Sequence, residues 1–243
     1  MSRAAQLRMT EPDDPAAAIT LNGVEAWCDP GGALWLPDWD ALVVSDLHFE
    51  KASHFAEAGY FVPPYDTGRT LDALESMVAR RGPSLVVSLG DAFHDPRGPG
   101  RMALPDRVRL ESLMRERDWV WVTGNHDPEP LEWPDRSLDG ETVDELRLGA
   151  LRLVHEPTEG EAPGEVSGHL HPVARIGRGR RSVKRPCFAC DGNRMVLPAV
   201  GAFTGGLNVC DRAFKPLFDR SRLVAHMLGD DRVYSVSGAA LCG

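Results

Sequence analysis

The sequence predicts an α/β fold, and three features of its hydrophobic pattern support that prediction. Residues 41–45, 84–89 and 119–122 form short, nearly unbroken apolar runs, which are typical of strands buried on both faces. Segments with apolar residues at helical spacing lie between these runs. After Asp127 the pattern changes to short alternating runs separated by turn residues, which predicts a second sheet.

Two helices are expected to connect the first three strands. Over residues 67–81, Leu71, Leu74 and Val78 share one helical face, and a less regular helical pattern covers residues 105–117. Strand and helix therefore alternate, as in open sheets with parallel strands. In such sheets, ligands bind beyond the carboxyl ends of the strands.

The second half of the chain is expected to form short antiparallel strands. Gly149-Ala150 and Asp191-Gly192 are the turn signals, and Gly177 and Gly179 suit the tip of a further hairpin. The expected strands cover residues 142–148, 151–155, 165–168, 173–176, 182–189 and 194–197. Because no linker separates the two halves, we expect one domain containing both sheets.

Length and composition agree with a single domain. A chain of 243 residues that is 42% hydrophobic can bury one core. We expect residues 1–18 to form a flexible tail and residues 19–243 to form the domain. The sequence shows neither a secretory signal nor an apolar run of membrane-spanning length, and its five scattered cysteines argue against a disulfide framework. These features predict a cytoplasmic protein with no membrane partner.

The overall charge is acidic, with one local exception. A formal charge of -9 would normally count against a nucleic-acid partner. The segment from Arg175 to Arg185 contains Arg178, Arg180 and Arg181 and no acidic residue, so a basic hairpin is expected around residues 173–190. This hairpin is either a solvated surface element or an element that follows the phosphates of a substrate.

Potential metal ligands follow the predicted strands at several points. Carboxylate, imidazole and amide groups without thiolates suit Mn, Fe or Zn, and five of the eight histidines fall in or just after strand-end blocks. The one CxxC pair, Cys187 and Cys190, has no second pair with which to form a structural zinc site. The candidate ligands are Asp46, His48, Asp91, Asn125, His155, His169 and His171. Such a set predicts a two-metal site that acts on phosphate esters.

The order of these blocks resembles a known superfamily. Asp-x-His, Gly-Asp, Gly-Asn-His-Asp, a later His and Gly-His-x-His, from Asp46 to His171, look like the calcineurin-like binuclear metallophosphoesterases. More narrowly, the segments at 48–51, 63–67, 168–172, 187–192 and 197–208 are similar to the ligase-associated DNA damage response endonucleases called PdeM.

The resemblance implies a fold and a role for each site residue. The fold would be a four-layer α/β/β/α sandwich of two mixed sheets flanked by helices. Asp91 would bridge two metals, most simply Mn, with Asp46, His48 and His171 on one and Asn125, His155 and His169 on the other. A hydroxide shared by the metals would attack the phosphate.

Two further residues would be catalytic without binding metal. His126 would protonate the leaving oxygen or stabilise the transition state, and Asp127 would fix the tautomer of His126. One departure from the superfamily stands beside them: Gly-Asp-x-x-Asp is replaced by Gly90-Asp91-Ala92-Phe93-His94, with Asp95 one position late. His94 either contacts substrate or supports its loop.

The resemblance and the basic hairpin predict a manganese-dependent endonuclease that hydrolyses phosphodiester bonds in DNA, with single-stranded DNA as the expected substrate, during DNA repair. A functional association with a DNA ligase and a helicase follows from the same resemblance. The alternative is a nucleotide or small-molecule phosphoesterase with the same metals. Stacking aromatics do not separate the two, because Phe49, Tyr60, Phe61 and Phe203 suit either the core or the surface.

Overall fold

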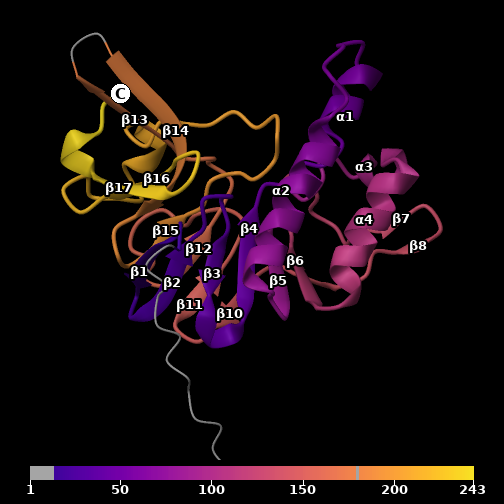
Figure 1. Ribbon diagram of the computed structural model, residues 1–243, viewed down its shortest axis with the longest axis horizontal. Coiled ribbons are helices and arrows are strands. Elements are labelled where there is room, and N and C mark those ends of the chain that lie inside the picture. The colour runs from indigo at the N-terminus through magenta and orange to yellow at the C-terminus, as the bar shows by residue number, and fades with distance from the viewer. Residues whose placement is uncertain (1–13, 179–180) are drawn as a thin grey trace, which may run out of the picture.

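The computed structural model describes residues 14–178 and 181–243, which form two sheets with helices on one side (Figure 1). The first sheet contains, in spatial order, β1 (Ala17–Leu21), β2 (Val24–Cys28), β3 (Leu34–Leu36), β4 (Ala41–Ser45), β5 (Leu85–Leu89), β6 (Asp118–Val122) and β9 (Glu141–Val143). Within this sheet β4, β5, β6 and β9 are parallel, and β1 to β3 add an antiparallel extension.

The second sheet is built from the later part of the chain. Its order is β10 (Leu146–Leu148), β11 (Leu151–Leu153), β12 (Glu165–Ser167), β15 (Met195–Val196), β14 (Arg181–Cys190), β16 (Val224–Leu228) and β17 (Val233–Ser237). In addition, β13 (Val173–Arg178) pairs with β14 and forms the projecting hairpin at the upper left of Figure 1.

Helices and short elements complete the fold. The helices are α1 (Lys51–Glu57), α2 (Asp66–Arg81), α3 (Gly98–Arg101) and α4 (Leu104–Arg115), and the 3-10 turns are η1 (Pro37–Trp39), η2 (Arg212–Phe214) and η3 (Gly238–Ala240). A small separate hairpin joins β7 (Glu132–Trp133) to β8 (Arg136–Ser137). None of the helices in the described residues has the length and apolar character needed to cross a membrane.

The apolar runs of the central strands are continuous because both of their faces are buried. Val43, Val87 and Val120 lie side by side across β4, β5 and β6 and face the second sheet. The alternate residues, including Leu42 and Val86, pack against helices α2 and α4. The outer face of the second sheet is covered by residues 209–223, which contain only the short turn η2. The predicted two-sheet α/β fold is confirmed, with a thin fourth layer.

One expected strand is wrong in detail. Residues 142–148 were predicted as a single strand, but the chain passes from one sheet to the other within this segment. β9 pairs with β6 in the first sheet, whereas β10 pairs with β11 in the second. A run of alternating residues does not reveal where a strand changes its partner, because both sheets bury one face in the same way.

Several elements have no counterpart in the sequence prediction. They are the helices α1 and α3 and the strands β1 to β3, β7, β8, β16 and β17. β1 begins at Ala17, within the segment expected to be a tail, and its side chains are only partly buried. Residues 1–13 of that segment lie outside the described residues.

A buried ion pair anchors β12, the strand that leads to His169. Arg194 and Glu165 are 3% and 1% exposed, and their side chains are in direct contact. Arg194 also donates to the carbonyl oxygens of Thr158 and Gly160, at 2.7 and 2.8 Å. Glu165 accepts a second cation, because Nη1 of Arg152 lies 3.0 Å from its Oε2. The pair therefore fixes the start of the strand to two loops.

Arg194→Ala should destabilise the fold by roughly 3 kcal/mol, because removing one partner leaves a buried carboxylate only partly compensated. Urea unfolding of the full chain measures this. Arg185→Ala is the matched control: its pair with Asp230 is solvent-exposed, so the expected cost is below about 1 kcal/mol. Equal losses in the two variants would contradict the assigned importance of the buried pair.

Candidate metal centre

The candidate ligands lie just beyond the ends of strands, on strained backbone. Asp46 follows β4 with φ 53°, His48 has φ 45°, and Asp91 follows Gly90 after β5 with φ 49°. His169 and His171, after β12, have φ 68° and 45°. Residues other than glycine adopt this left-handed conformation at a cost of order 1–3 kcal/mol each, and such strain clusters at functional sites. Here it turns successive polar side chains toward one crevice.

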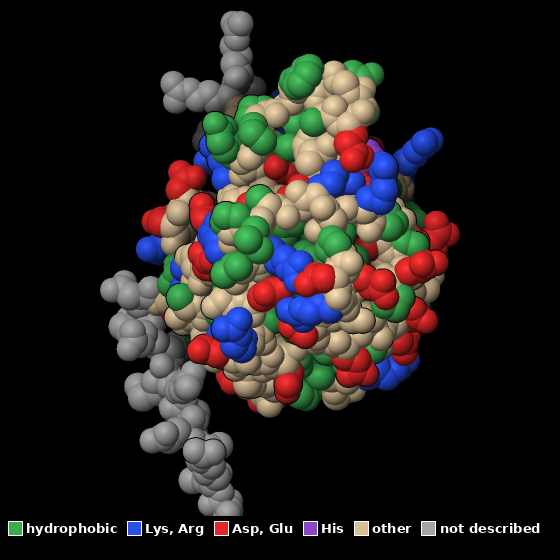
Figure 2. Space-filling model, turned by 90° about the vertical axis from the view of Figure 1, so that its right-hand side faces the viewer, with side chains coloured by type: hydrophobic (Ala, Val, Ile, Leu, Met, Phe, Trp, Pro, Cys, Tyr) green, Lys and Arg blue, Asp and Glu red, His purple; other side chains and the backbone are tan. Residues whose placement is uncertain are grey.

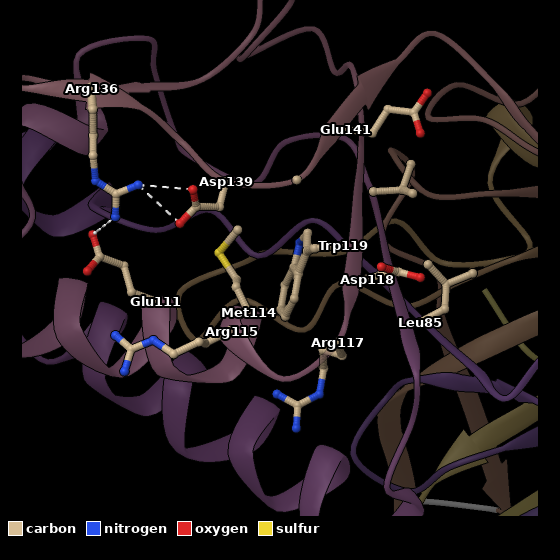
Figure 3. Close-up of a pocket in the computed structure, with 12 residues that line it drawn as sticks. Leu85, Glu111, Met114, Arg115, Arg117, Asp118, Trp119, Arg136, Asp139 and Glu141 are labelled. Atoms are coloured by element: carbon tan, nitrogen blue, oxygen red, sulfur yellow. Dashed lines mark hydrogen bonds and ion pairs between the residues drawn. The ribbon is translucent and has the colours of Figure 1, made fainter.

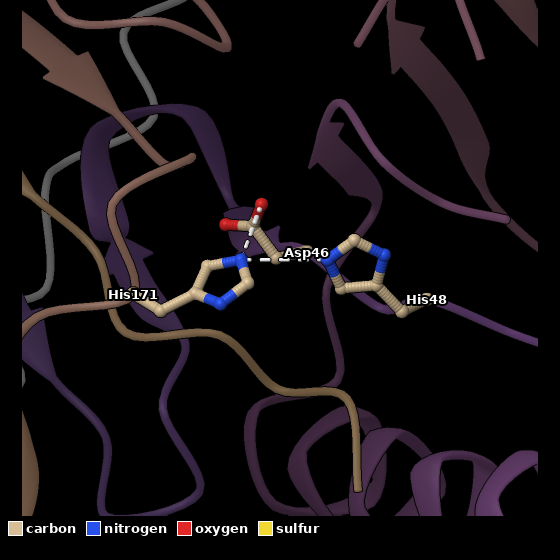
Figure 4. A group of neighbouring side chains, drawn as sticks. All are labelled: Asp46, His48 and His171. Carbon is tan, nitrogen blue, oxygen red and sulfur yellow. Dashed lines mark hydrogen bonds and ion pairs between the residues drawn. The ribbon is translucent and has the colours of Figure 1, made fainter. Parts of the chain in front are cut away.

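The first ligand group consists of Asp46, His48 and His171 (Figure 4). Their ligand atoms all lie within 4.8 Å of one another. Oδ1 of Asp46 is 3.1 Å from Nε2 of His171, and Nε2 of His171 is 3.4 Å from Nε2 of His48. Asp46 is fully buried, and its other oxygen accepts a short hydrogen bond from the hydroxyl of Ser45. The first sheet thus supplies two residues and the second sheet one.

The second group consists of Asp91, His155 and His169. Nε2 of His155 is 3.4 Å from Oδ1 of Asp91. The amide oxygen of Asn125 lies 3.0 Å from Nε2 of His155 and 2.8 Å from Nδ1 of His169. The other oxygen of Asp91 is 3.8 Å from Nε2 of His48, in the first group. Asp91 therefore faces both groups.

The electrostatics of the crevice favour a cation. Although burial opposes ionisation, the contact with His155 lowers the pKa of Asp91 to about 2. Burial alone would lower the pKa of His155, but Asp91 and Asp46 outweigh burial and raise this pKa to about 9. Burial lowers the pKa of His48 to about 3, so that imidazole is neutral at pH 7. Two buried carboxylates thus draw positive charge into the site.

This donor set fits a pair of divalent metals. Two carboxylates, four imidazoles and one amide oxygen converge without a thiolate, which suits Mn, Fe or Zn. A cation would take over the charge that His155 otherwise carries as a proton, because a metal-binding imidazole must be neutral.

Backbone carbonyl groups orient several of the imidazoles. Nδ1 of His155 lies 2.9 Å from the carbonyl oxygen of Leu89, and Nδ1 of His171 lies 3.2 Å from that of Gly205. Such contacts fix the proton on Nδ1 and leave Nε2 free to bind a metal.

The expected link between Asp127 and the His126 ring is wrong. The Asp127 carboxylate accepts hydrogen bonds from the backbone amides of Asp91, Ala92 and Phe93, at 2.9, 2.7 and 3.2 Å. Nδ1 of His126 instead lies 2.9 Å from the carbonyl oxygen of His94. Asp127 therefore holds the loop that carries Asp91, and the tautomer of His126 is set by backbone.

His94 occupies the position where the sequence departs from the superfamily. Its ring stacks on that of His126, with centroids 4.8 Å apart and planes at 23°. Its Nδ1 is 3.4 Å from Nδ1 of His48. Burial, with the nearby charges of Lys51 and His126, lowers the pKa of His94 to about 4. A neutral imidazole therefore packs against both one candidate ligand, His48, and the candidate catalytic histidine.

A chain of polar contacts behind His94 was not expected from the sequence. The late Asp95 contacts Nδ1 of His54 at 2.8 Å and forms an ion pair with Arg101. The His54 ring packs edge-on against His94, with centroids 4.8 Å apart. Asp95 thus supports the loop that carries His94. In the sequence, the signal for this was that Asp95 stands one position later than the aspartate of the superfamily pattern.

Two glycines permit the close packing of these loops. A Cβ at Gly124 would meet the backbone nitrogen and Oδ1 of Asp91 and would lie 2.7 Å from Oδ1 of Asp127. A Cβ at Gly168 would collide with the Ser45 hydroxyl and lie 2.6 Å from Oδ2 of Asp46. Space, rather than positive φ, requires glycine at both positions.

The basic hairpin is described only in part. Its strands β13 and β14 pair from Val173 opposite Pro186 to Arg178 opposite Arg181. Arg180 and the side chains of Arg178 and Arg181 lie outside the described residues, so their expected contact with substrate stays a prediction. β13 begins two residues after His171, which places its base beside the ligand groups.

A separate surface cavity of about 650 Å³ lies at the opposite ends of the strands (Figure 3). It is bordered by the first residues of β5 and β6, Leu85 and Asp118, and by α4. Arg136 spans it by pairing with Asp139 and Glu111, at 3.0 and 2.9 Å. Arg136 is thereby neutralised by its own neighbours, and the cavity contains neither ligand group. The histidine-rich crevice is therefore the better candidate for chemistry.

Comparisons with known proteins agree with this geometry. A family model described as calcineurin-like phosphoesterase matches residues 41–187. The structure is similar to Pseudomonas putida nuclease MPE, with a TM-score of 0.70 and 28% sequence identity, covering 91% of this chain and 100% of that one. The Escherichia coli phosphoesterase YfcE gives a TM-score of 0.39 and 20% identity, over 81% of this chain and 98% of its own. Comparison with curated proteins gave no significant match.

Metal-dependent stability should distinguish ligands from neighbouring groups. Added Mn²⁺ should raise the thermal unfolding temperature of metal-stripped protein. At a Mn²⁺ concentration one hundred times the dissociation constant, the free energy of unfolding should increase by about 2.7 kcal/mol. Asp91→Asn should lose most of this response, since Asp91 faces both groups. His126→Ala, which removes a neighbouring imidazole that is not expected to bind metal, should keep it. A lost response in His126→Ala would make His126 a ligand.

Proposed function

The chain belongs to the calcineurin-like phosphoesterase family, as its motifs predicted, and from this premise we propose that it is a metal-dependent endonuclease acting on single-stranded DNA. The observation that carries the chemistry is the pair of ligand groups that Asp91 faces, with His126 beside them. Similarity to a nuclease over 91% of the chain supports the choice of a phosphodiester substrate.

The proposed metal ligands are the seven residues of the crevice. Asp46, His48, Asp91 and His171 would hold one cation, and Asp91, Asn125, His155 and His169 the other. The bound cations would neutralise charge on the phosphoryl oxygens and favour ionisation of the attacking water. We propose Mn as the physiological metal because of the resemblance to the ligase-associated endonucleases; the oxygen- and imidazole-rich donor set is compatible with it.

His126 is suited to handle the proton of the leaving group. The carbonyl oxygen of His94 can only accept a hydrogen bond, so Nδ1 of His126 carries its proton in either charge state. Nε2 is then free to face the substrate, and it donates when the ring is protonated. The ring is 39% exposed, and Nε2 lies 4.0 Å from Asp91. His94 restricts the ring plane by stacking, so we propose His126 as general acid and His94 as the group that positions it.

The basic hairpin would bind the substrate strand outside the metal centre. Arg175, Lys184 and Arg185 are exposed along β13 and β14. Contacts with backbone phosphates would make affinity depend on salt concentration. We propose a role in DNA repair in the cytoplasm, in functional association with a DNA ligase and a helicase, as the resemblance to ligase-associated endonucleases suggests.

The alternative function is hydrolysis of nucleotides or other small phosphate esters. The formal charge of -9 favours it, because an acidic surface repels a long polyanion and hardly affects a small ester. The two functions differ in substrate length rather than in chemistry.

A substrate panel tests the proposal directly. Metal-stripped protein with Mn²⁺ restored should cut a single-stranded oligonucleotide internally, cut the matching duplex much more slowly, and hydrolyse bis(p-nitrophenyl) phosphate. Product lengths on a denaturing gel and release of p-nitrophenol provide the readouts. Hydrolysis of p-nitrophenyl phosphate or nucleotides alone would support the alternative.

Charge reversal in the hairpin tests its role. The triple variant Arg178→Glu, Arg180→Glu, Arg181→Glu should reduce oligonucleotide cleavage at least about tenfold, because each lost phosphate contact weakens binding. Hydrolysis of bis(p-nitrophenyl) phosphate should stay unchanged. A control triple reversal of Arg115, Arg147 and Arg222, which are exposed on other segments, gives the same net charge. Similar losses in both triples would show that only total charge matters.

A further inference from the structure

The segment between α1 and α2 exposes an uncharged aromatic surface. Residues 58–65, with the sequence AGYFVPPY, are all exposed and include no charged side chain. Tyr60, Phe61 and Tyr65 are 68%, 94% and 63% exposed. Figure 2 shows hydrophobic side chains gathered on the projecting upper part of this face, where Figure 1 places the segment beyond α1. Clusters of exposed aromatic side chains are a common feature of binding sites.

The segment is held in this position by its local structure. α1 begins three residues after His48, so the segment projects from the same strand end as the first ligand group. The amide of Tyr60 donates to the carbonyl oxygen of Phe55 at 2.9 Å, closing the end of the helix. Pro63 and Pro64 then restrict the backbone before α2. The rings are thus displayed at little entropic cost on binding.

Helix α1, which directly precedes this segment, carries an aromatic ring that packs beside the metal centre. The ring of Phe55, on α1, lies 5.8 Å from that of His94, with planes at 35°. His94 in turn stacks on His126. We define Phe55, Tyr60, Phe61 and Tyr65 as the aromatic shelf. Phe55 lies beside His94, the group that stacks on the proposed catalytic His126, and the other three rings belong to the exposed segment that follows.

We propose that the aromatic shelf stacks the bases of a single-stranded nucleic acid whose phosphate occupies the metal centre. The inference rests on the proposed function and extends it by assigning a site for the bases. Phosphates have no ionic partner on residues 58–65, whereas the π-face of any base can stack on a ring. Bases in a duplex are already stacked on one another, so the shelf would favour a single strand. The preference for single-stranded over double-stranded DNA would therefore arise from the shelf rather than from the metals.

Inhibition of small-ester hydrolysis measures this binding whether or not DNA is cut. In this assay the Mn²⁺-loaded enzyme receives bis(p-nitrophenyl) phosphate as its substrate, and a phosphorothioate oligonucleotide is added as the competitor. The variant Tyr60→Leu, Phe61→Leu keeps apolar side chains but removes the ring faces. Its inhibition constant should be at least about fivefold higher than that of the wild type. An oligonucleotide with several abasic positions should bind the wild type correspondingly more weakly and should show no further loss with the variant.

Two control variants and the kcat for the small ester distinguish loss of the shelf from loss of any exposed aromatic side chain or of catalytic activity. Tyr234→Leu removes an aromatic side chain that is 51% exposed on β17 and should leave the inhibition constant unchanged. Phe61→Trp should restore affinity in the Tyr60→Leu background. The kcat for the small ester should be the same in all variants, since none of these residues belongs to the metal centre.

The outcomes distinguish the shelf from the proposed function. Cleavage of the oligonucleotide with equal inhibition by normal and abasic strands would overturn the shelf and leave the nuclease intact. Ring-dependent inhibition without cleavage would support the shelf and overturn the nuclease. The proposal would also be overturned if the wild type sediments as a dimer and the double leucine variant as a monomer, with the same inhibition constant. The rings would then contact a second copy of the chain.

Discussion

The site depends on burying two carboxylates where the sheets meet. Asp46 and Asp91 are 0% and 2% exposed, and each lies on left-handed backbone within two residues of the end of a parallel strand. A buried carboxylate is tolerated only with hydrogen-bond donors or cations around it. Ser45, the backbone amides of His126 and His169, and the imidazoles of both groups meet this requirement. The polar crevice and the strained loops around it follow from that constraint.

The second sheet contributes to the site through the same contacts that dock it on the first. His155 follows β11, yet its Nδ1 contacts the carbonyl oxygen of Leu89 on β5. The amide of His169 donates to Asp46, and Val200 and Gly201 donate to the carbonyl oxygens of Ser45 and Asp46. The two sheets therefore cannot shift relative to each other without moving ligands. Below this polar rim, the apolar layer between the sheets supplies the cohesion.

The sequence predicted the central strands well because burial on both faces leaves an unbroken apolar run, as in Ala41–Ser45. Edge strands such as Ala17–Leu21 are half exposed and share their composition with loops. In the site, residue types and strand ends indicated the ligands. The contacts of Asp127 could not be predicted, since they depend on the conformation of residues 91–93, far away in sequence. The shelf was equally hidden, because exposure of Tyr60 and Phe61 is a property of the packed fold.

The distribution of ligands along the chain also bears on biosynthesis. His48 and His171 meet in space although they are 123 positions apart. At translation rates of about 5–20 residues per second, roughly 6–25 s separate their synthesis. The first sheet can begin to pack during this interval while Asp46 and Asp91 still lack the imidazoles of the second half. Complete metal loading must therefore await emergence of residue 171 from the ribosome, which makes cofactor acquisition a late step in the maturation of the polypeptide.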